Sequence, residues 1–267
     1  MSQPFLDTDA VAGWMREHVP GFEGPITVEK FATGQSNPTF KLSTPSGAYV
    51  LRRKPPGQLL KSAHAVDREF RVQQALAGSD VPVTRMHALC TDEAVIGAMF
   101  YVMDFVVGRT FIAPRLPDLS AADRTAVFDD MNRVLAALHQ VDLTAAKLGD
   151  YGPTGNYYER QIERWAKQYR ASETETLPDM DALMGWLQSN LPDDDGRLTL
   201  VHGDYRIDNL LFTKDTPTCV AVLDWELSTL GHPFADLAAV IMQWSLPPGD
   251  TGRGLAGVDR AEIRKQT

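Results

Sequence analysis

The chain has 267 residues, of which 43% are hydrophobic and 23% are charged, a composition typical of an ordinary soluble globular protein. Its net charge of −9 argues against a duplex DNA or RNA binder, and its most apolar stretch, Ala94–Met103, is shorter than the ~20 residues that span a bilayer, so we expect neither a nucleic-acid nor a membrane partner. The two cysteines, Cys90 and Cys219, form no metal-type pair, and the N-terminus lacks the features of a signal peptide, so a reducing, cytoplasmic location is expected.

The N-terminal part of the chain is predicted to form a small antiparallel sheet with helices beside it. Apolar residues at helical spacing predict a helix over Asp7–Val19. A second helix is expected over Ser62–Ala77. The expected strands are Ile26–Ala32, Thr39–Ser43, Ala48–Arg53, Val83–Leu89 and Ala98–Phe105, with a β-turn at Thr44–Gly47.

The rest of the chain is predicted to be mainly helical, after a hinge at Val106–Arg109. The expected helices are Ser120–Val141, Tyr157–Arg170, Asp179–Ser189 and Pro233–Trp244. We expect nearly all of their apolar stripes to pack into a core.

The segment that carries chemistry is Leu198–Phe212 together with Val220–Glu226, which we interpret as a strand, a loop, a hairpin and an acid at a strand end. Its polar skeleton is His202-x-Asp204-x4-Asn209, followed by Asp224. Kinase-type phosphoryl transfer needs one carboxylate to orient an alcohol and accept its proton, and oxygen ligands to hold Mg²⁺ on the phosphates. The pattern therefore predicts an ATP-dependent phosphotransferase acting on a small-molecule alcohol, with Asp204 as catalytic base and Asn209 and Asp224 as Mg²⁺ ligands.

Four neighbouring residues have less specific interpretations. Asp208 is as well explained by solvent exposure or a backbone hydrogen bond as by a direct role. Glu226 lies on the same side of an extended chain as Asp224, so it can reach a second cation. We expect His202 to order the loop through hydrogen bonds and Asp236 to support the structure.

Nucleotide phosphates are expected to meet Arg52 on the third strand. Glu69 shares a helix face with Val72 and Leu76, so it should point inward, where an unpaired carboxylate is costly. A cationic partner for Glu69 is therefore expected, and Arg52 is the candidate, although Lys54 lies on the same strand face. A weak surface ion pair is the alternative.

Two further segments are candidates for nucleotide contacts. Gly34, Ser36 and Asn37 belong to a loop that can lie over phosphates, because glycine permits close approach of the backbone; a plain hairpin loop is the alternative. The apolar strand end Tyr101–Gly108 lies where adenine can stack and bond to the backbone.

Two other functions remain open on the residues alone. One is a nucleotide-binding pseudo-kinase without turnover. The other is a metal-dependent hydrolase using His202, Asp204, Asp224 and His232, which would leave Asn209 unexplained.

At Val201–Phe212, Val222–Glu226 and Gly231–Ala238 the chain resembles the aminoglycoside phosphotransferase and choline kinase family, which has the protein-kinase-like fold. The resemblance implies an α+β, bilobal fold. Residues 1–106 would form a small antiparallel-sheet, nucleotide-binding lobe, and residues 107–267 a mainly helical catalytic and substrate lobe.

By the same resemblance, Asp204 is catalytic, Asn209 and Asp224 bind Mg²⁺, and the backbone of Asp104 and Val106 holds the adenine of ATP. The family usually has Lys where this chain has Arg52, which keeps the charge but replaces a compact ammonium by a planar fork.

A narrower resemblance concerns Tyr49–Gly57 and Asp67–Leu76, which are similar to kinase-like domains fused to, or encoded near, certain acyl-CoA dehydrogenases. Those domains are associated with phosphorylation of hydroxylated acyl-CoA, so the acceptor is expected to be hydroxyacyl-CoA-like or aminoglycoside-like. The family usually continues for several helices beyond the expected helix Pro233–Trp244, so the substrate lobe is expected to be either reduced or incomplete in this sequence. The oligomeric state stays open.

Overall fold

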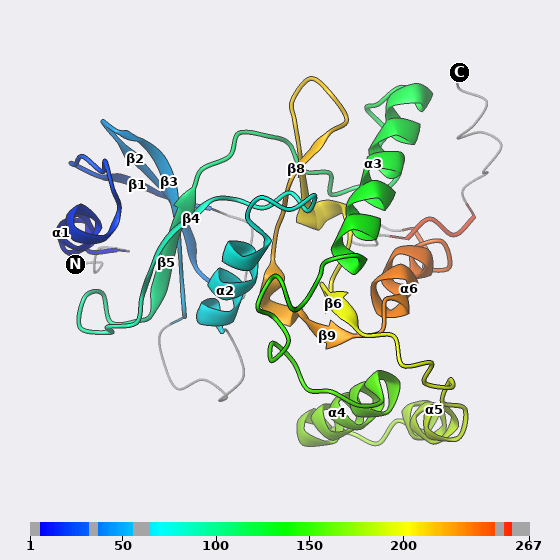
Figure 1. Ribbon diagram of the computed structural model, residues 1–267. Helices are drawn as coiled ribbons and strands as arrows, with labels where there is room; N and C mark the ends of the chain where they lie inside the picture. The colour runs from blue at the N-terminus through cyan, green and yellow to red at the C-terminus, as the bar shows by residue number, and fades with distance from the viewer. Residues whose placement is uncertain (1–5, 32–36, 56–64, 249–253, 258–267) are drawn as a thin grey trace.

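The computed structural model describes residues 6–31, 37–55, 65–248 and 254–257. Figure 1 shows a β-sheet flanked by helices at the N-terminal end of the molecule and a mainly helical region at the other end. The N-terminal elements are α1 (Thr8–His18), β1 (Thr27–Lys30), β2 (Thr39–Thr44), β3 (Gly47–Arg53), α2 (Val66–Leu76), β4 (Met86–Cys90) and β5 (Phe100–Asp104). The elements that follow are α3 (Ala121–His139), α4 (Tyr157–Ser172), α5 (Pro178–Ser189), β6 (Thr199–Val201), η1 (Ile207–Asn209), β7 (Leu210–Phe212), β8 (Cys219–Val222), η2 (Trp225–Leu227), β9 (Thr229–Gly231) and α6 (Phe234–Met242).

The N-terminal sheet has five antiparallel strands in the order β1-β2-β3-β5-β4. Side chains alternate between its two faces. Leu51 packs with α1, whereas Val50 packs with Val66 of α2. Arg52 is two residues from Val50 on the central strand, so its side chain points to the same face as α2.

Strand ends differ modestly from the expected ones. β4 begins at Met86 instead of Val83 because Met86 pairs with Met103, one residue before β5 ends. β1 ends at Lys30, and residues 32–36, which hold the predicted phosphate loop up to Ser36, lie outside the described part of the chain. The second helix begins at Val66, and residues 56–64 also lie outside the described part.

The second region is built on one large hydrophobic core, whose largest fully buried side chain is Trp225. α3 contributes an apolar face to this core. Two short antiparallel strand pairs, β6–β9 and β7–β8, also contribute side chains to it. The pairing of β6 with β9 was not expected from the sequence.

The segment after β5 is fastened to β7 by main-chain hydrogen bonds. Arg109 N–H donates to Phe212 O over 2.8 Å, and Phe212 N–H donates to Arg109 O over 2.9 Å. Gly108 permits this approach, because a Cβ there would lie 2.5 Å from Phe212 O. The hinge expected at Val106–Arg109 is therefore attached to β7 of the β7–β8 hairpin.

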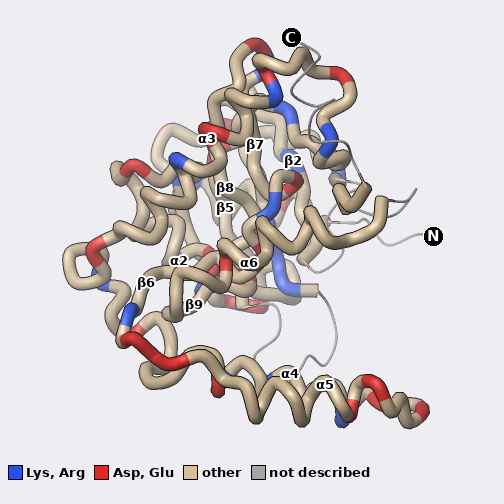
Figure 2. The backbone as a smooth tube through the Cα atoms, turned by 90° about the vertical axis from the view of Figure 1, so that its right-hand side faces the viewer, with Lys and Arg blue, Asp and Glu red and all other residues tan. Residues whose placement is uncertain are grey.

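The helices α4 and α5 lie together at one end of the molecule in both views (Figures 1 and 2). Neither contains a buried residue; Trp165 is 51% exposed and Trp186 is 60% exposed. The expectation that nearly all apolar stripes pack into a core is wrong for these two helices, because periodicity reports an amphipathic face but not whether another element covers it. Within the described segments, no helix combines the length and apolarity needed to cross a bilayer.

Candidate active site

The loop between β6 and β7 carries Asp204, and its side chains alternate between core and surface. Tyr205 and Ile207 are buried in the large core, and the Tyr205 hydroxyl donates to Met131 O of α3 over 2.7 Å. Asp204 and Asp208 point the other way, and the Asp204 side chain keeps 31% exposure. The apolar residues therefore anchor the loop and present its polar residues on one side.

A fully buried carboxylate braces the start of this loop. Asp236 of α6 accepts hydrogen bonds from the backbone N–H of His202 over 2.9 Å and of Gly203 over 2.8 Å, and His139 Nε2 lies 3.1 Å from it. Gly203 has φ +84°, and a Cβ there would lie 2.7 Å from Leu227 O. Asp236 thus has the supporting place expected from the sequence, and the turn needs glycine.

His202 is buried and both of its ring nitrogens bond to the backbone. Nδ1 lies 3.2 Å from the backbone nitrogen of Asp204, whose N–H can only donate. Nδ1 therefore accepts this hydrogen bond, and Nε2 carries the ring proton. Nε2 donates to Leu223 O over 2.9 Å. His202 therefore ties the Asp204 loop to the chain just before Asp224, which is the ordering role expected for it.

Asp204 is bonded to the predicted metal ligand Asn209. Asn209 Nδ2 donates to Asp204 Oδ2 and to Asp204 O, each over 2.9 Å. Burial raises the pKa of Asp204 above its ordinary value, against the lowering effects of the Arg206 charge and of the Asn209 hydrogen bond. Fixing the Asn209 nitrogen on Asp204 leaves its oxygen Oδ1 to face a cation.

Asp224 lies beside Asn209 because of the β7–β8 pairing. Leu223 N–H donates to Asn209 O over 2.8 Å, and Asp224 follows with a left-handed backbone, at φ 63° and ψ 60°. This conformation is uncommon outside glycine but is tolerated by Asp. The hairpin thus brings together the two residues that the sequence predicts as Mg²⁺ ligands.

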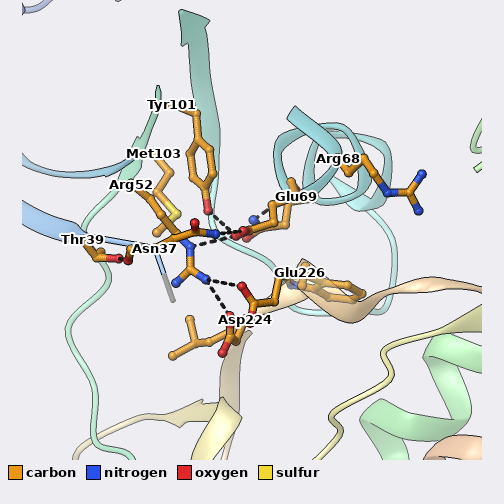
Figure 3. Close-up of polar contacts among 12 residues, drawn as sticks. Asn37, Thr39, Arg52, Arg68, Glu69, Tyr101, Met103, Asp224 and Glu226 are labelled. Atoms are coloured by element: carbon orange, nitrogen blue, oxygen red, sulfur yellow. Dashed lines mark hydrogen bonds and ion pairs between the residues drawn. The ribbon is translucent and has the colours of Figure 1, made fainter. Parts of the chain in front are cut away.

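Arg52 connects the sheet, α2 and the segment that follows the β7–β8 hairpin (Figure 3). Its Nε lies 2.9 Å from Glu69 Oε2, an ion pair in which the N–H direction falls outside hydrogen-bond geometry. Its Nη2 donates to Asp224 Oδ1 over 2.6 Å and lies 3.9 Å from Glu226 Oε2. Arg52 is therefore the cationic partner expected for Glu69, and it also holds the predicted metal ligand Asp224.

Glu69 is buried and contacts one cation and two hydrogen-bond donors. Besides Arg52, Asn37 Nδ2 donates to it over 2.7 Å and the Tyr101 hydroxyl over 3.0 Å. Burial raises the pKa of Glu69 to about 7, and the charge of Arg52 and the Tyr101 hydrogen bond lower it only in part. Burial lowers the pKa of Arg52, but the carboxylates of Glu69 and Asp224 outweigh it and raise that pKa, so the guanidinium stays charged.

The remaining predicted nucleotide contacts are placed as follows. Gly34 and Ser36 lie outside the described residues, and the buried Asn37 directs its amide toward Glu69. Asp104 ends β5, with its N–H bonded to Arg85 O and its carboxylate 2.6 Å from His87 Nε2. The Val106 N–H makes no hydrogen bond to the main chain of the described segments, so it is free to donate to a ligand.

One residue that sequence reasoning missed lies against Asp204. Arg206 Nε is 3.2 Å from Asp204 Oδ1, and Arg206 Nη2 is 3.3 Å from Asp208 Oδ2. The signal was available, because polar and apolar residues alternate from Asp204 to Asp208 and place Arg206 on the same side as Asp204.

The donors present fit Mg²⁺ better than a transition metal. The Asn209 amide oxygen and Asp224 Oδ2 are hard oxygen donors, of the kind that Mg²⁺ binds together with phosphate oxygens. Across the described ranges, no three His, Cys, Asp or Glu side chains gather as a metal-binding group. His232, part of the hydrolase alternative, instead lies 2.8 Å from the Tyr158 hydroxyl and 3.2 Å from Asp195.

Comparison with known proteins gives a consistent picture. A model of the phosphotransferase enzyme family matches residues 27–263. Acyl-CoA dehydrogenase family member 11 of Mus musculus is 44% identical over 251 residues, which cover 92% of this chain and 32% of that protein. The chain therefore spans about a third of the length of this relative.

Solved structures agree with the fold. A protein from Ralstonia eutropha JMP134, assigned as an aminoglycoside phosphotransferase, is 55% identical with a TM-score of 0.86, covering 97% of this chain and 76% of that one. A thermostable mutant of the aminoglycoside phosphotransferase APH(4)-Ia, in a ternary complex with ADP and hygromycin B, is 20% identical with a TM-score of 0.59, covering 87% of this chain and 75% of that one. The α+β, protein-kinase-like fold expected from the sequence is confirmed.

Proposed function

Because the chain belongs to the phosphotransferase enzyme family, we propose that it is an ATP-dependent O-phosphotransferase that moves the γ-phosphate of ATP to a hydroxyl group of a small molecule. The observation that carries this proposal is the convergence of Asp204, Asn209 and Asp224 on one hairpin. The Arg52–Glu69 ion pair beside them supports it. These are the parts that kinase-type phosphoryl transfer requires.

In the proposed reaction Asp204 orients the acceptor hydroxyl and accepts its proton. The acceptor oxygen forms a bond to the γ-phosphorus, the bond from that phosphorus to the bridging oxygen breaks, and ADP leaves. The raised pKa of Asp204 makes its carboxylate a stronger proton acceptor than an exposed Asp. Most of the rate enhancement would come from positioning and charge neutralisation, as in other phosphoryl transfers.

Other residues would hold the nucleotide. Arg52 would meet its phosphates, with Glu69 keeping the guanidinium in place, and the backbone of Asp104 and Val106 would meet the adenine. Asn209 and Asp224 would hold Mg²⁺, which supplies charge neutralisation on the phosphates when bound. The ADP bound to the structural relative APH(4)-Ia supports ATP as the donor. Residues 1–106 would then be the nucleotide-binding lobe and residues 107–267 the catalytic and substrate lobe.

The acceptor proposed here is a hydroxyacyl-CoA-like alcohol. The similarity over most of this chain to part of an acyl-CoA dehydrogenase family protein favours that class over an aminoglycoside-like alcohol. Both classes carry free hydroxyl groups, so the chemistry at Asp204 is the same for either.

The test is ADP release from Mg²⁺-ATP across a panel of hydroxyacyl-CoAs, aminoglycosides, choline-like amino alcohols and sugars. Replacing Asp204 by Asn should reduce acceptor-dependent turnover by about 10²–10⁴-fold, the usual contribution of a general base, while nucleotide binding survives. Calorimetric titration with Mg²⁺-ADP checks that binding.

Asp193→Asn is the matched control, since it makes the same change at an exposed loop position and should keep the parent rate. Parent-like turnover of Asp204→Asn would show that Asp204 is not the base. Nucleotide binding with no ADP release for any acceptor would favour the pseudo-kinase.

A further inference from the structure

Arg206 shares the exposed side of the catalytic loop with Asp204. Its neighbours Tyr205 and Ile207 are 1% and 2% exposed, whereas the Arg206 side chain is 29% exposed and that of Asp204 is 31%. The Arg206 backbone is extended, at φ −138° and ψ 158°, and the buried neighbours on either side fix its direction. The guanidinium is therefore held beside the carboxylate that the proposed reaction uses.

The contacts of Arg206 leave much of its hydrogen-bonding capacity unused. A guanidinium has five N–H donors. Within the described residues, Arg206 Nη2 donates one hydrogen bond to Asp208 over 3.3 Å. Arg206 Nε lies 3.2 Å from Asp204 in an ion pair, but it makes no hydrogen bond. An anion placed near Asp204 can thus be bound without breaking a strong contact.

Arg52, by contrast, is paired with other carboxylates. Its Nε lies 2.9 Å from Glu69 and its Nη2 lies 2.6 Å from Asp224. Of the two cations described at this site, Arg206 alone contacts Asp204. A hydroxyl held by Asp204 would receive the phosphoryl group only a few ångströms from the Arg206 guanidinium.

We propose that Arg206 is a further catalytic residue, which binds the phosphoryl group during its transfer to the acceptor held by Asp204. This deepens the proposed function and rests on it. In phosphoryl transfer, negative charge is spread over the three non-bridging oxygens of the moving group while the bond to the acceptor oxygen forms and the bond to ADP breaks. An arginine supplied from the same chain stabilises that charge and fits it with a planar, two-pronged donor.

The test compares Arg206→Gln and Arg206→Lys with the parent in two measurements. Turnover with the acceptor that the panel identifies should fall on the order of 10³-fold for Arg206→Gln, mainly in kcat, and less for Arg206→Lys. Calorimetry should show that Arg206→Gln binds Mg²⁺-ADP with unchanged affinity. Aluminium fluoride, a mimic of the transferring phosphoryl group, should tighten ADP binding in the parent but not in Arg206→Gln.

Two controls separate this role from a structural one. Arg133→Gln also removes a guanidinium from an Asp partner, on exposed α3 surface, and should leave both measurements unchanged. Asp208→Asn removes the other partner of Arg206 but keeps its charge, so the aluminium fluoride effect should survive.

If Asp208→Asn lost the aluminium fluoride effect as completely as Arg206→Gln did, Arg206 would only bridge two loop carboxylates. That result would overturn the inference. If Arg206→Gln kept the kcat of the parent and its tightening by aluminium fluoride, the inference would also be overturned. In that case the proposed function would still stand, provided that Asp204→Asn lost acceptor-dependent turnover. Absence of turnover in the parent would refute the proposed function instead.

Discussion

At the scale of the single residue, Arg52 is the feature that most distinguishes this site. One guanidinium lies within 4 Å of three carboxylates from two separate elements, namely Glu69, Asp224 and Glu226. It reaches the first through Nε and the second through Nη2, which a single lysine ammonium could not do with the same geometry. Arg52 thus joins α2 to the segment that follows the β7–β8 hairpin.

The ion pair of Arg52 has a pH-dependent consequence through Glu69. The pKa of Glu69 is about 7 in the folded protein, above its ordinary value of 4.5. The folded state therefore holds this proton more tightly than the unfolded state, and the free energy of unfolding should fall by about 3 kcal/mol as pH rises from about 4.5 to about 7. Urea unfolding at several pH values measures this loss.

Glu69→Gln cannot ionise, so its stability should lack this part of the pH dependence, whereas Glu93→Gln, at an exposed turn, should keep it. If Glu69→Gln and the parent lost stability in parallel over this window, the buried Glu69 carboxyl would not be the group responsible.

Residues at this site differ in how visible they are in the sequence. The burial of Glu69 and its pairing with Arg52 follow from helix periodicity and the cost of a lone buried charge. The bond from Asn37 to Glu69 does not, because it joins a loop to a helix 32 positions away. The proposed roles of Asp204, Asn209 and Asp224 stay predictions, although the structure places the three together.

At the scale of the element, the conformation of the loop between β6 and β7 depends on a glycine. Gly203 has φ +84°, and a Cβ added there would lie 2.7 Å from Leu227 O, so any side chain would collide with that carbonyl. The Asp236 carboxylate then receives the Gly203 and His202 N–H groups. The position of Asp204 depends on this turn, although the turn touches no ligand itself.

Gly203→Ala should therefore destabilise the protein by about 1–3 kcal/mol and reduce turnover, because the Cβ forces both the left-handed backbone and the Leu227 contact to change. Denaturant unfolding and ADP release measure the two effects. Gly185→Ala is the matched control: it lies in α5 with open space around it, so it should be neutral or slightly stabilising. Equal behaviour of the two variants would contradict the steric argument.

Elements with strong local signals were predicted well, and those formed by distant pairing were not. Within the described residues, the sequence predicts each strand of the N-terminal sheet and each α-helix, with shifted ends. The pairing of β6 with β9 was missed because each strand has three residues and their partners are 28 to 32 positions apart, too short and too distant for a periodic signal. Pairing of this kind is decided by the tertiary structure.

At the scale of the whole molecule, burial is unevenly distributed. The β7–β8 hairpin lies directly on the largest core, since Trp225 follows Asp224 and is 1% exposed. The helices α4 and α5 lie together at one end of the molecule (Figure 2), and neither contains a buried residue. Sequence periodicity could identify these helices but could not assign them to the surface, because their apolar residues resemble those of the core helices.

A matched pair of tryptophan substitutions tests this distribution. Trp225→Ala should lower the free energy of unfolding by about 3–5 kcal/mol, the usual cost of removing a buried tryptophan. Trp186→Ala, at a side chain 60% exposed, should change it by less than about 0.5 kcal/mol. Chemical denaturation followed by circular dichroism measures both, and a large effect of Trp186→Ala would mean that α5 contributes to the core.

The hydrogen bond between Arg52 and Asp224 also bears on how the chain reaches its native state. It closes a loop of 172 positions, and both ends need a formed neighbour, the sheet at one end and the β7–β8 hairpin at the other. Contacts of such long sequence separation form slowly, after the local structure that they join. During refolding we therefore expect secondary structure to recover first and catalytic competence last, so that regained activity marks the completion of folding.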